Sequence, residues 1–294
     1  MWHQLLNEIK QGNSKALART ISLVENEFEN YFELLQQLPD SSSKIIGITG
    51  PPGAGKSTLT DALIGEMVSQ NKKVGVLCVD PSSPFNLGAL LGDRIRMSEW
   101  YNHPNVFIRS LATRGSLGGL HPKILEITDV MKAAEFDFII IETVGVGQSE
   151  VEIAGLADVT IVVVVPEAGD EVQTMKAGLM EIADVFVVNK ADRPDADIFV
   201  KNLRNILTPA HKTGIPVVKT IASQKEGIKE LFEKIIGQLK ITSSLERKYF
   251  LMAERAYHLI EQYRMKNISK EELRKEIESK QYLNLYQFIQ QYFN

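Results

Sequence analysis

Residues 50–57 have the types and spacing needed to bind phosphate groups. They read Gly-Pro-Pro-Gly-Ala-Gly-Lys-Ser and fit the pattern G-x-x-x-x-G-K-[ST] between a β-branched run and a helical stretch. The glycines let backbone N–H groups turn toward phosphate oxygens, and the start of the next helix adds partial positive charge. Lys56 is expected to neutralise the β- and γ-phosphates, and the Ser57 hydroxyl to coordinate Mg²⁺. The residues predicted to hold a nucleoside triphosphate are Gly50, Pro51, Pro52, Gly53, Ala54, Gly55, Lys56, Ser57 and Thr58.

A second motif, Asn189-Lys190-Ala191-Asp192, indicates which base the triphosphate carries. The Asp192 carboxylate can accept hydrogen bonds from guanine N1–H and N2–H₂. Adenine lacks this pair of donors, and a buried carboxylate left unpaired is costly. Lys190 is expected to lie over the base plane and Asn189 to tie its loop to residues 50–57. The base contacts are assigned to Asn189, Lys190 and Asp192, and to the backbone of Ala222 and Ser223, which follow a later strand.

Two acidic residues stand at the ends of predicted strands between these motifs. Asp80 closes one apolar run, and Glu142 closes another, three residues before Gly145. In a parallel sheet both acids would lie at the carboxyl edge, where ligands bind, and a carboxylate there can hold Mg²⁺ directly or through water. The Gly145 N–H could approach the γ-phosphate. The alternative is a pair of solvated strand ends, but beside a phosphate-binding loop the metal role is favoured.

Taken together, five stretches resemble the MeaB/ArgK family, a branch of the SIMIBI-class P-loop GTPases. The resemblance runs from about residue 15 to about residue 235. It implies an Mg²⁺-dependent GTPase that assists an adenosylcobalamin-dependent acyl-CoA mutase, chiefly methylmalonyl-CoA mutase, in cofactor loading and protection. It also implies a homodimer. The older name of the family, ArgK, describes a kinase of a transport system, but no phosphotransfer motif in this chain supports kinase activity. The five stretches are residues 50–57, 79–84, 91–97, 142–150 and 189–192.

The resemblance also implies roles for particular residues. It places Asp93 near the metal and the attacking water, within residues 85–97, whose glycines permit a switch. Gln148 could orient water, and residues 166–173 match a further switch that communicates with the mutase. From the residues alone, Asp93 is a loop acid, Gln148 a helix-start residue and 166–173 a polar loop. The implied catalytic residues are Lys56, Asp93, Glu142 and Gln148, and the implied metal ligands are Ser57, Asp80, Asp93 and Glu142.

The elements that must position these side chains are short β-branched runs separated mostly by helical segments. Many runs are apolar on consecutive residues, which is typical of strands buried on both faces. Alternation with helices predicts an α/β fold with a mostly parallel sheet. With the phosphate-binding loop this is a P-loop NTPase fold, and the family resemblance implies the SIMIBI type. The predicted divisions are a helical extension over residues 1–40, a GTPase domain over 41–240 and a helical arm over 241–294. The predicted strands are residues 44–49, 73–80, 106–112, 136–143, 159–165, 184–189 and 215–221.

Both ends of the chain read as helical. Before residue 39, apolar residues at helical spacing lie on either side of Gly12-Asn13-Ser14 and predict two amphipathic helices. The second is expected to carry Phe28 and Phe32 on its apolar face. Residues 245–294 read as two or three helices with much apolar surface, which must be buried against the GTPase domain or a second copy. A homodimer is the favoured reading, and a cap on the same subunit is the alternative.

Composition narrows the class of protein further. Among 294 residues, 33 Lys and Arg stand against 37 Asp and Glu, so no basic excess points to nucleic acid or to a membrane surface. The single cysteine, Cys78, excludes an internal disulfide and a four-thiolate zinc site. The first 43 residues resemble no targeting signal, so a cytoplasmic protein is expected. Two rivals remain: a nickel-inserting SIMIBI chaperone, which needs Cys or His near its switches, and a small-molecule kinase, which has no need of the guanine motif.

Overall fold

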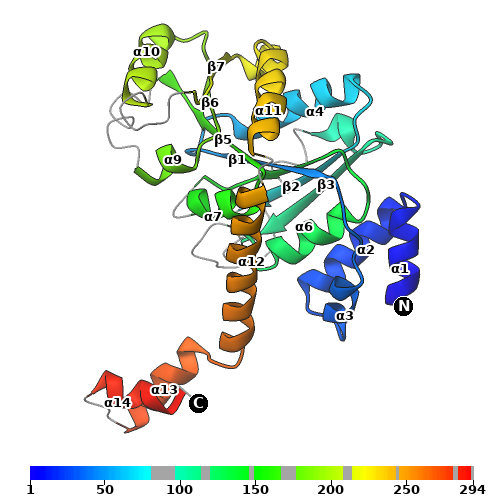
Figure 1. Cartoon of the computed structure of the whole chain (residues 1–294), viewed down its shortest axis with the longest axis vertical. Coiled ribbons are helices and arrows are strands. Elements are labelled where there is room, and N and C mark those ends of the chain that lie inside the picture. The colour runs from blue at the N-terminus through cyan, green and yellow to red at the C-terminus, as the bar shows by residue number, and fades with distance from the viewer. Residues whose placement is uncertain are drawn as a thin grey trace. The chain divides into compact units, whose positions relative to one another are not determined.

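The computed structural model describes residues 1–80, 97–113, 120–145, 149–166, 177–207, 214–242, 245–280 and 284–292 (Figure 1). These residues form two compact units, Met1–Arg247 and Lys248–Asn294. Within the described ranges, no helix combines the length and the apolar character needed to cross a membrane.

The first unit is built on a seven-stranded sheet with the order β3-β2-β4-β1-β5-β6-β7. Every neighbouring pair of strands is parallel. The seven predicted runs and the α/β fold are therefore confirmed, although several strands begin one or two residues later, or end one residue earlier, than predicted. The strands are β1 (Lys44–Thr49), β2 (Val74–Asp80), β3 (Val106–Ala112), β4 (Phe138–Glu142), β5 (Val159–Val164), β6 (Val185–Asn189) and β7 (Val217–Thr220).

Helices cover both faces of the sheet, which explains why the strand residues are apolar on consecutive positions. Ile46 and Ile48 of β1 pack in one core cluster with α4 (Lys56–Ser69) and α11 (Ile228–Thr242). Ile45 faces the opposite cluster, which holds residues of α6 (Ile124–Lys132) and α7 (Ser149–Leu156). Gly47 lets α7 approach β1 closely, because a Cβ there would lie 2.6 Å from Ile153. Figure 1 shows α4 and α11 on one side and α6 and α7 on the other.

The strand order places the carboxyl end of β1 at the centre of the sheet. From β1 the chain crosses through α4 to β2 on one side, and from β4 it crosses through α7 to β5 on the other side. Ligands of parallel α/β sheets bind outside the carboxyl ends of the strands where successive connections diverge in this way. Farther along, α9 (Ala177–Ile182) and α10 (Ala196–Leu207) pack on β5 and β6 in a third cluster.

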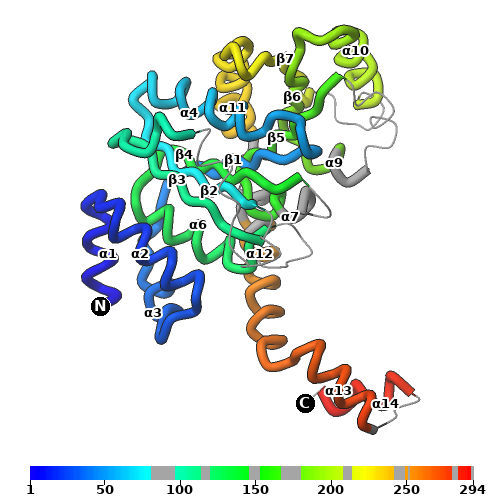
Figure 2. Tube along the Cα trace, turned by 180° about the vertical axis from the view of Figure 1, so that it is seen from behind, coloured from blue at the N-terminus to red at the C-terminus, as the bar shows by residue number. Residues whose placement is uncertain are grey.

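The N-terminal residues form three helices, one more than the spacing predicts: α1 (Trp2–Lys10), α2 (Ser14–Glu25) and α3 (Tyr31–Gln36). The prediction that Phe28 and Phe32 lie on the buried face of the second helix is wrong, since they are 47% and 57% exposed. Glu27 and Asn30 take left-handed backbone angles, with φ of 48° and 60°, which end the helical spacing between α2 and α3. Figure 2 shows these helices beside α6.

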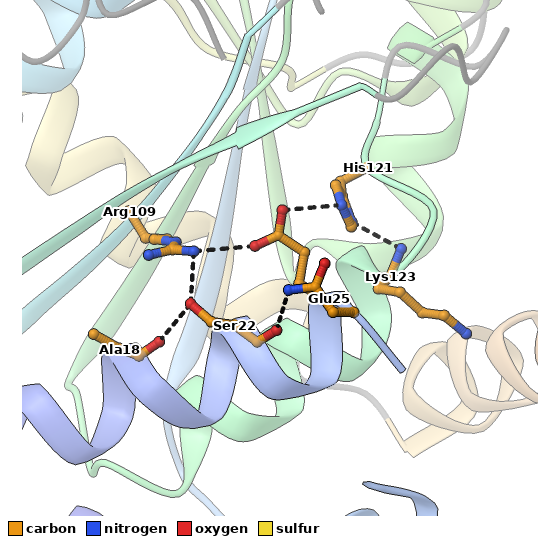
Figure 3. Close-up of polar contacts among 7 residues, drawn as sticks. Ala18, Ser22, Glu25, Arg109, His121 and Lys123 are labelled. Carbon is orange, nitrogen blue, oxygen red and sulfur yellow. Dashed lines mark hydrogen bonds and ion pairs between the residues drawn. The ribbon is translucent and has the colours of Figure 1, made fainter. Parts of the chain in front are cut away.

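A charged network joins α2 to the edge strand β3 and to the start of α6 (Figure 3). The Glu25 carboxylate accepts a hydrogen bond from Arg109 at 3.0 Å, and its other oxygen lies 3.7 Å from His121 Nε2. Arg109 also donates to the Ser22 hydroxyl at 3.0 Å. His121 is buried and Glu25 is nearly buried. These contacts therefore fix α2 against strand β3 and against the residues that precede α6.

Lys123, next to α6, extends this network to the loop after α2. Its ammonium group pairs with Glu27 at 3.0 Å and Glu126 at 3.1 Å, and it contacts the Tyr31 hydroxyl at 3.2 Å. Burial alone would lower the pKa of Lys123, but Glu126, Glu27 and Tyr31 outweigh it, so that the pKa stands above its ordinary value. The N-terminal helices are thus held by charge pairs as well as by apolar packing.

The described C-terminal residues include three α-helices, in agreement with the two or three helices predicted from the sequence: α12 (Leu245–Met265), α13 (Lys270–Lys280) and α14 (Leu285–Ile289). Within the second unit, the Tyr292 hydroxyl donates to Glu276 at 2.6 Å, and Phe288 packs against the Tyr292 ring. The helix α12 carries several large apolar side chains that are more than half exposed: Tyr249, Phe250, Met252, Tyr257, Ile260, Tyr263 and Met265.

Candidate nucleotide site

The loop between β1 and α4 has the backbone shape that its glycines predict. Gly50, Gly53 and Gly55 have φ of 139°, 75° and 89°, a region that other residues rarely adopt. Gly50 also lies directly against the Val163 carbonyl, where a side chain would not fit. Lys56 begins α4, is buried, and donates to the carbonyl oxygens of Gly50 at 3.0 Å and Pro51 at 3.2 Å. The lysine therefore spans the inside of the loop.

Glu142 at the end of β4 lies against α4, as its place at the carboxyl edge predicts. Its carboxylate is 4% exposed and accepts from the Ser57 hydroxyl at 2.6 Å and the Thr60 hydroxyl at 2.8 Å. Two short hydrogen bonds compensate for the loss of water around this buried acid. Sequence reasoning missed Thr60. Its spacing of three residues from Ser57, which puts both hydroxyls on one helical face, was the available signal.

Asp80 and Gly145 occupy the same edge of the sheet. Asp80 ends β2, the strand paired with β4, and Cys78 is the residue in register with Glu142. The Asp80 side chain is 7% exposed. Gly145 has φ of 83°, and a side chain there would collide with the Gly50 carbonyl and the Lys56 ammonium. The turn after β4 therefore contacts the loop after β1 directly.

The residues predicted to recognise the base surround a cavity of roughly 240 Å³. Lys190, with φ of 56°, donates to the Gly53 carbonyl at 2.8 Å, so its stem lies toward the glycine-rich loop. The cavity brings together residues that are far apart in the chain, including Arg193, which the motif did not predict. Its lining residues are Gly55, Thr58, Asn189, Lys190, Asp192, Arg193, Ile221, Ala222 and Ser223.

Asn189 holds the loops around this cavity in place. Its side-chain amide donates to the Ala54 carbonyl at 2.9 Å, which ties the end of β6 to the loop after β1. Its carbonyl oxygen accepts from the Thr220 hydroxyl and the Ala222 N–H, both at 3.1 Å. The asparagine is 3% exposed, and it makes the contact with residues 50–57 that was expected of it.

The donor set at the phosphate end suits a hard cation. Ser57, Glu142 and Asp80 offer hydroxyl and carboxylate oxygens, the ligands that Mg²⁺ prefers, and Mg²⁺ needs only one or two carboxylates beside phosphate and water. In the part of the chain that the structure describes, no three His, Cys, Asp or Glu side chains gather as a metal cluster. Cys78 is buried, as expected of a core residue in β2. Asp93, Gln148 and residues 167–173 lie outside the described residues.

The chain matches, over residues 17–280, the family described as methylmalonyl-CoA mutase-associated GTPase MeaB. It belongs to this family. A Pyrococcus abyssi protein named as a GTPase is 50% identical over 243 residues, which are 80% of this chain and 75% of that protein. The GTPase ArgK of Escherichia coli is 36% identical over 244 residues, 79% of this chain and 74% of ArgK. This MeaB/ArgK protein is therefore a GTPase, and membership of the family implies that it binds a nucleotide.

Two further likenesses bear on partner and fold. A fused isobutyryl-CoA mutase of Geobacillus kaustophilus is 34% identical over 289 residues, which are 87% of this chain but 26% of the mutase. A crystal structure of an LAO/AO transport system kinase superposes with a TM-score of 0.67 at 24% identity, covering 99% of this chain and 96% of that one. The second likeness concerns the fold alone.

The predicted contact between Asp192 and guanine can be tested by measuring which nucleotide the protein prefers. Asp192→Asn should weaken GTP binding by about 2–4 kcal/mol, the scale of a mismatched hydrogen bond to a charge. It should also shift preference toward xanthosine triphosphate, whose C2 carbonyl can pair with the new amide. Calorimetric titration with GTP, ATP and xanthosine triphosphate measures both effects. Asp195→Asn, an exposed change outside the cavity lining, is the matched control. Equal affinity of the unaltered protein for ATP and GTP contradicts the guanine assignment.

Proposed function

We propose that this MeaB-family GTPase uses Mg²⁺-dependent GTP hydrolysis to assist an adenosylcobalamin-dependent acyl-CoA mutase in loading and protecting its cofactor. The observation that carries the proposal is the Geobacillus kaustophilus relative, in which a region similar to this chain is part of a mutase polypeptide. Fusion into one chain gives the two activities a high effective concentration for each other. The family's description also associates its members with methylmalonyl-CoA mutase.

The phosphate end of the site supports the hydrolytic step. Lys56 now bonds to two loop carbonyls, and phosphate oxygens of GTP would replace these partners on the same ammonium group. Ser57 would bind Mg²⁺ through its hydroxyl, while Glu142 and Asp80 would hold the metal or its water molecules. The bound metal supplies neutralisation of charge on the transferred phosphoryl group. Asp93 and Gln148 are proposed, from the family resemblance, to act on the metal and the attacking water.

The base end supports the choice of GTP. The proposed guanine contacts come from Asp192 and from the backbone of Ala222 and Ser223, which line one cavity with the glycine-rich loop. Lys190, bonded to Gly53, would cover the face of the base. Because Asn189 ties these loops together, recognition of the base and cradling of the phosphates depend on the same buried amide.

The assignment of metal and phosphate roles can be tested by separating binding from turnover. Lys56→Ala should abolish tight triphosphate binding, because the charge that faces the phosphates is lost. Glu142→Gln should keep nucleotide binding but lower Mg²⁺-dependent turnover about a hundredfold, the usual scale for one charge-stabilising group. Phosphate release and fluorescent-nucleotide binding measure the two effects. Glu66→Gln, which alters an acid of α4 that bonds to Gln70, serves as control. Normal hydrolysis by Glu142→Gln contradicts the metal role.

The mutase partnership can be tested by affinity capture from host lysate. The bait is the full chain loaded with GTP-γ-S, and Lys56→Ala protein in the same buffer controls for capture that does not depend on nucleotide. Recovery of a cobalamin-dependent mutase on the first bait and its loss on the second is the expected result. Recovery of a nickel enzyme instead, or equal recovery on both baits, contradicts the proposal.

The C-terminal helices are proposed to form a homodimer. Large apolar side chains are more than half exposed along α12, exposed apolar surface is commonly buried in an interface between protein chains, and closed two-fold dimers are the commonest oligomers. Light scattering should give twice the chain mass for the full-length protein. Truncation after Lys240 should give a particle with the mass of a single shortened chain and leave GTP binding intact, because the residues proposed to bind the nucleotide all precede it. A full-length monomer at micromolar concentration rules the dimer out.

A further inference from the structure

The turn after β4 meets the end of β1 through a buried pair of hydroxyl groups. Thr143 directly follows Glu142, and its hydroxyl donates to the Thr49 hydroxyl at 2.9 Å. Thr49 is the last residue of β1 and directly precedes Gly50, where the phosphate-binding loop begins. Both threonines are buried. Neither hydroxyl has a part in the nucleotide roles assigned so far.

The hydroxyl pair complements the contacts of Glu142, so that the end of β4 is held from both faces of the sheet. The Glu142 carboxylate bonds to two hydroxyls of α4 on one face. Since side chains alternate between faces along a strand, Thr143 belongs with Ile141, which packs in the core cluster that includes α7 residues. The backbone N–H of Thr143 also donates to the Ile48 carbonyl at 3.0 Å, which continues the pairing of β4 with β1.

Just beyond Thr143, the chain reaches the phosphate-binding loop at Gly145. A Cβ on Gly145 would lie 2.4 Å from both the Gly50 carbonyl oxygen and the Lys56 ammonium nitrogen. That ammonium group is the one expected to face the β- and γ-phosphates, so the Gly145 backbone lies beside the proposed position of the γ-phosphate. Between the two residues, Val144 packs against the α7 side of the core. The bond at Thr143 is therefore the last side-chain hydrogen bond before Gly145.

We propose that Thr49 and Thr143 are positioning residues for the γ-phosphate, because their hydrogen bond fixes the turn after β4 against β1 and keeps the Gly145 N–H within reach of the triphosphate. This inference rests on the proposed function, in which the site binds and hydrolyses GTP. A hydrogen bond is directional, whereas apolar packing allows small shifts of the two segments past each other. GDP has no γ-phosphate, so the hydroxyl pair should affect binding of the triphosphate and not of the diphosphate.

The first experiment removes one hydroxyl at a time and measures nucleotide binding by calorimetric titration with Mg²⁺ present. Thr49→Val and Thr143→Val keep the shape of the side chain. Each should weaken binding of a non-hydrolysable GTP analogue about fivefold, the scale of one hydrogen bond, and leave GDP affinity within about twofold. Thr143→Ser keeps the hydroxyl and should keep the affinity of the unaltered protein. Thr128→Val is the matched control, because it removes a buried hydroxyl that bonds within α6. An unchanged preference for the triphosphate over GDP in both valine variants overturns the positioning role.

The second experiment separates positioning from a purely structural role. A single valine leaves one buried hydroxyl without its partner, whereas Thr49→Val combined with Thr143→Val removes both, which is far less costly to stability. The double variant should therefore regain most of the melting temperature that either single variant loses, and it provides the test even where a single variant fails to fold. It should still bind the GTP analogue about fivefold more weakly than the unaltered protein does, because an apolar pair does not fix the turn.

Recovery of the melting temperature together with the triphosphate preference shows that the hydroxyls serve packing only, and it overturns the positioning role while the proposed function stands. Absence of Mg²⁺-dependent GTP hydrolysis by the unaltered protein overturns the proposed function, and the positioning role with it.

Discussion

The buried carboxylate of Glu142 is the constraint around which the phosphate end of the site is built. An ionised acid taken out of water is costly unless hydrogen bonds replace its hydration. Ser57 and Thr60 supply those bonds at 2.6 and 2.8 Å, and both belong to the first turns of α4. The carboxylate therefore fixes the rotation of α4 about its own axis relative to β4. That rotation decides where Lys56, the first residue of α4, points.

Asn189 plays a similar structural role near the loops proposed to bind the base, where an uncharged amide takes the place of a carboxylate. A single side-chain amide satisfies a carbonyl of the loop after β1, a hydroxyl at the end of β7 and a backbone N–H just beyond it. Loops that follow parallel strands leave the sheet at one edge, so three segments distant in sequence come within reach of one residue. The proposed nucleotide site thus contains two polar junctions: Glu142 beside the glycine-rich loop, and Asn189 beneath the loops proposed to bind the base.

Much of this arrangement could be predicted from the sequence because it depends on local signals. The strands are apolar on consecutive residues, and the glycine-rich loop and Asn189–Asp192 carry their chemistry in adjacent positions. Thr60 was missed because its partner, Glu142, is 82 residues away, and its spacing of three residues from Ser57 does not by itself show which group the two hydroxyls bind. The end of α2 was missed because Phe28 and Phe32 continue the apolar spacing, although the backbone turns left-handed at Glu27 and Asn30. Only packing in three dimensions decides such cases.

The pairing of Thr60 with Glu142 also explains why the strand ends in glutamate. An aspartate in its place would withdraw the carboxylate by about one C–C bond, about 1.5 Å. The bonds to Ser57 and Thr60 would then stretch beyond the range of a hydrogen bond, leaving a buried charge unsatisfied. The helix could not move inward to restore them, because Leu59 and Leu63 of α4 are already packed without exposure in the core. The length of the acid and the second hydroxyl on α4 therefore depend on each other, and a change in either one requires a compensating change in the other.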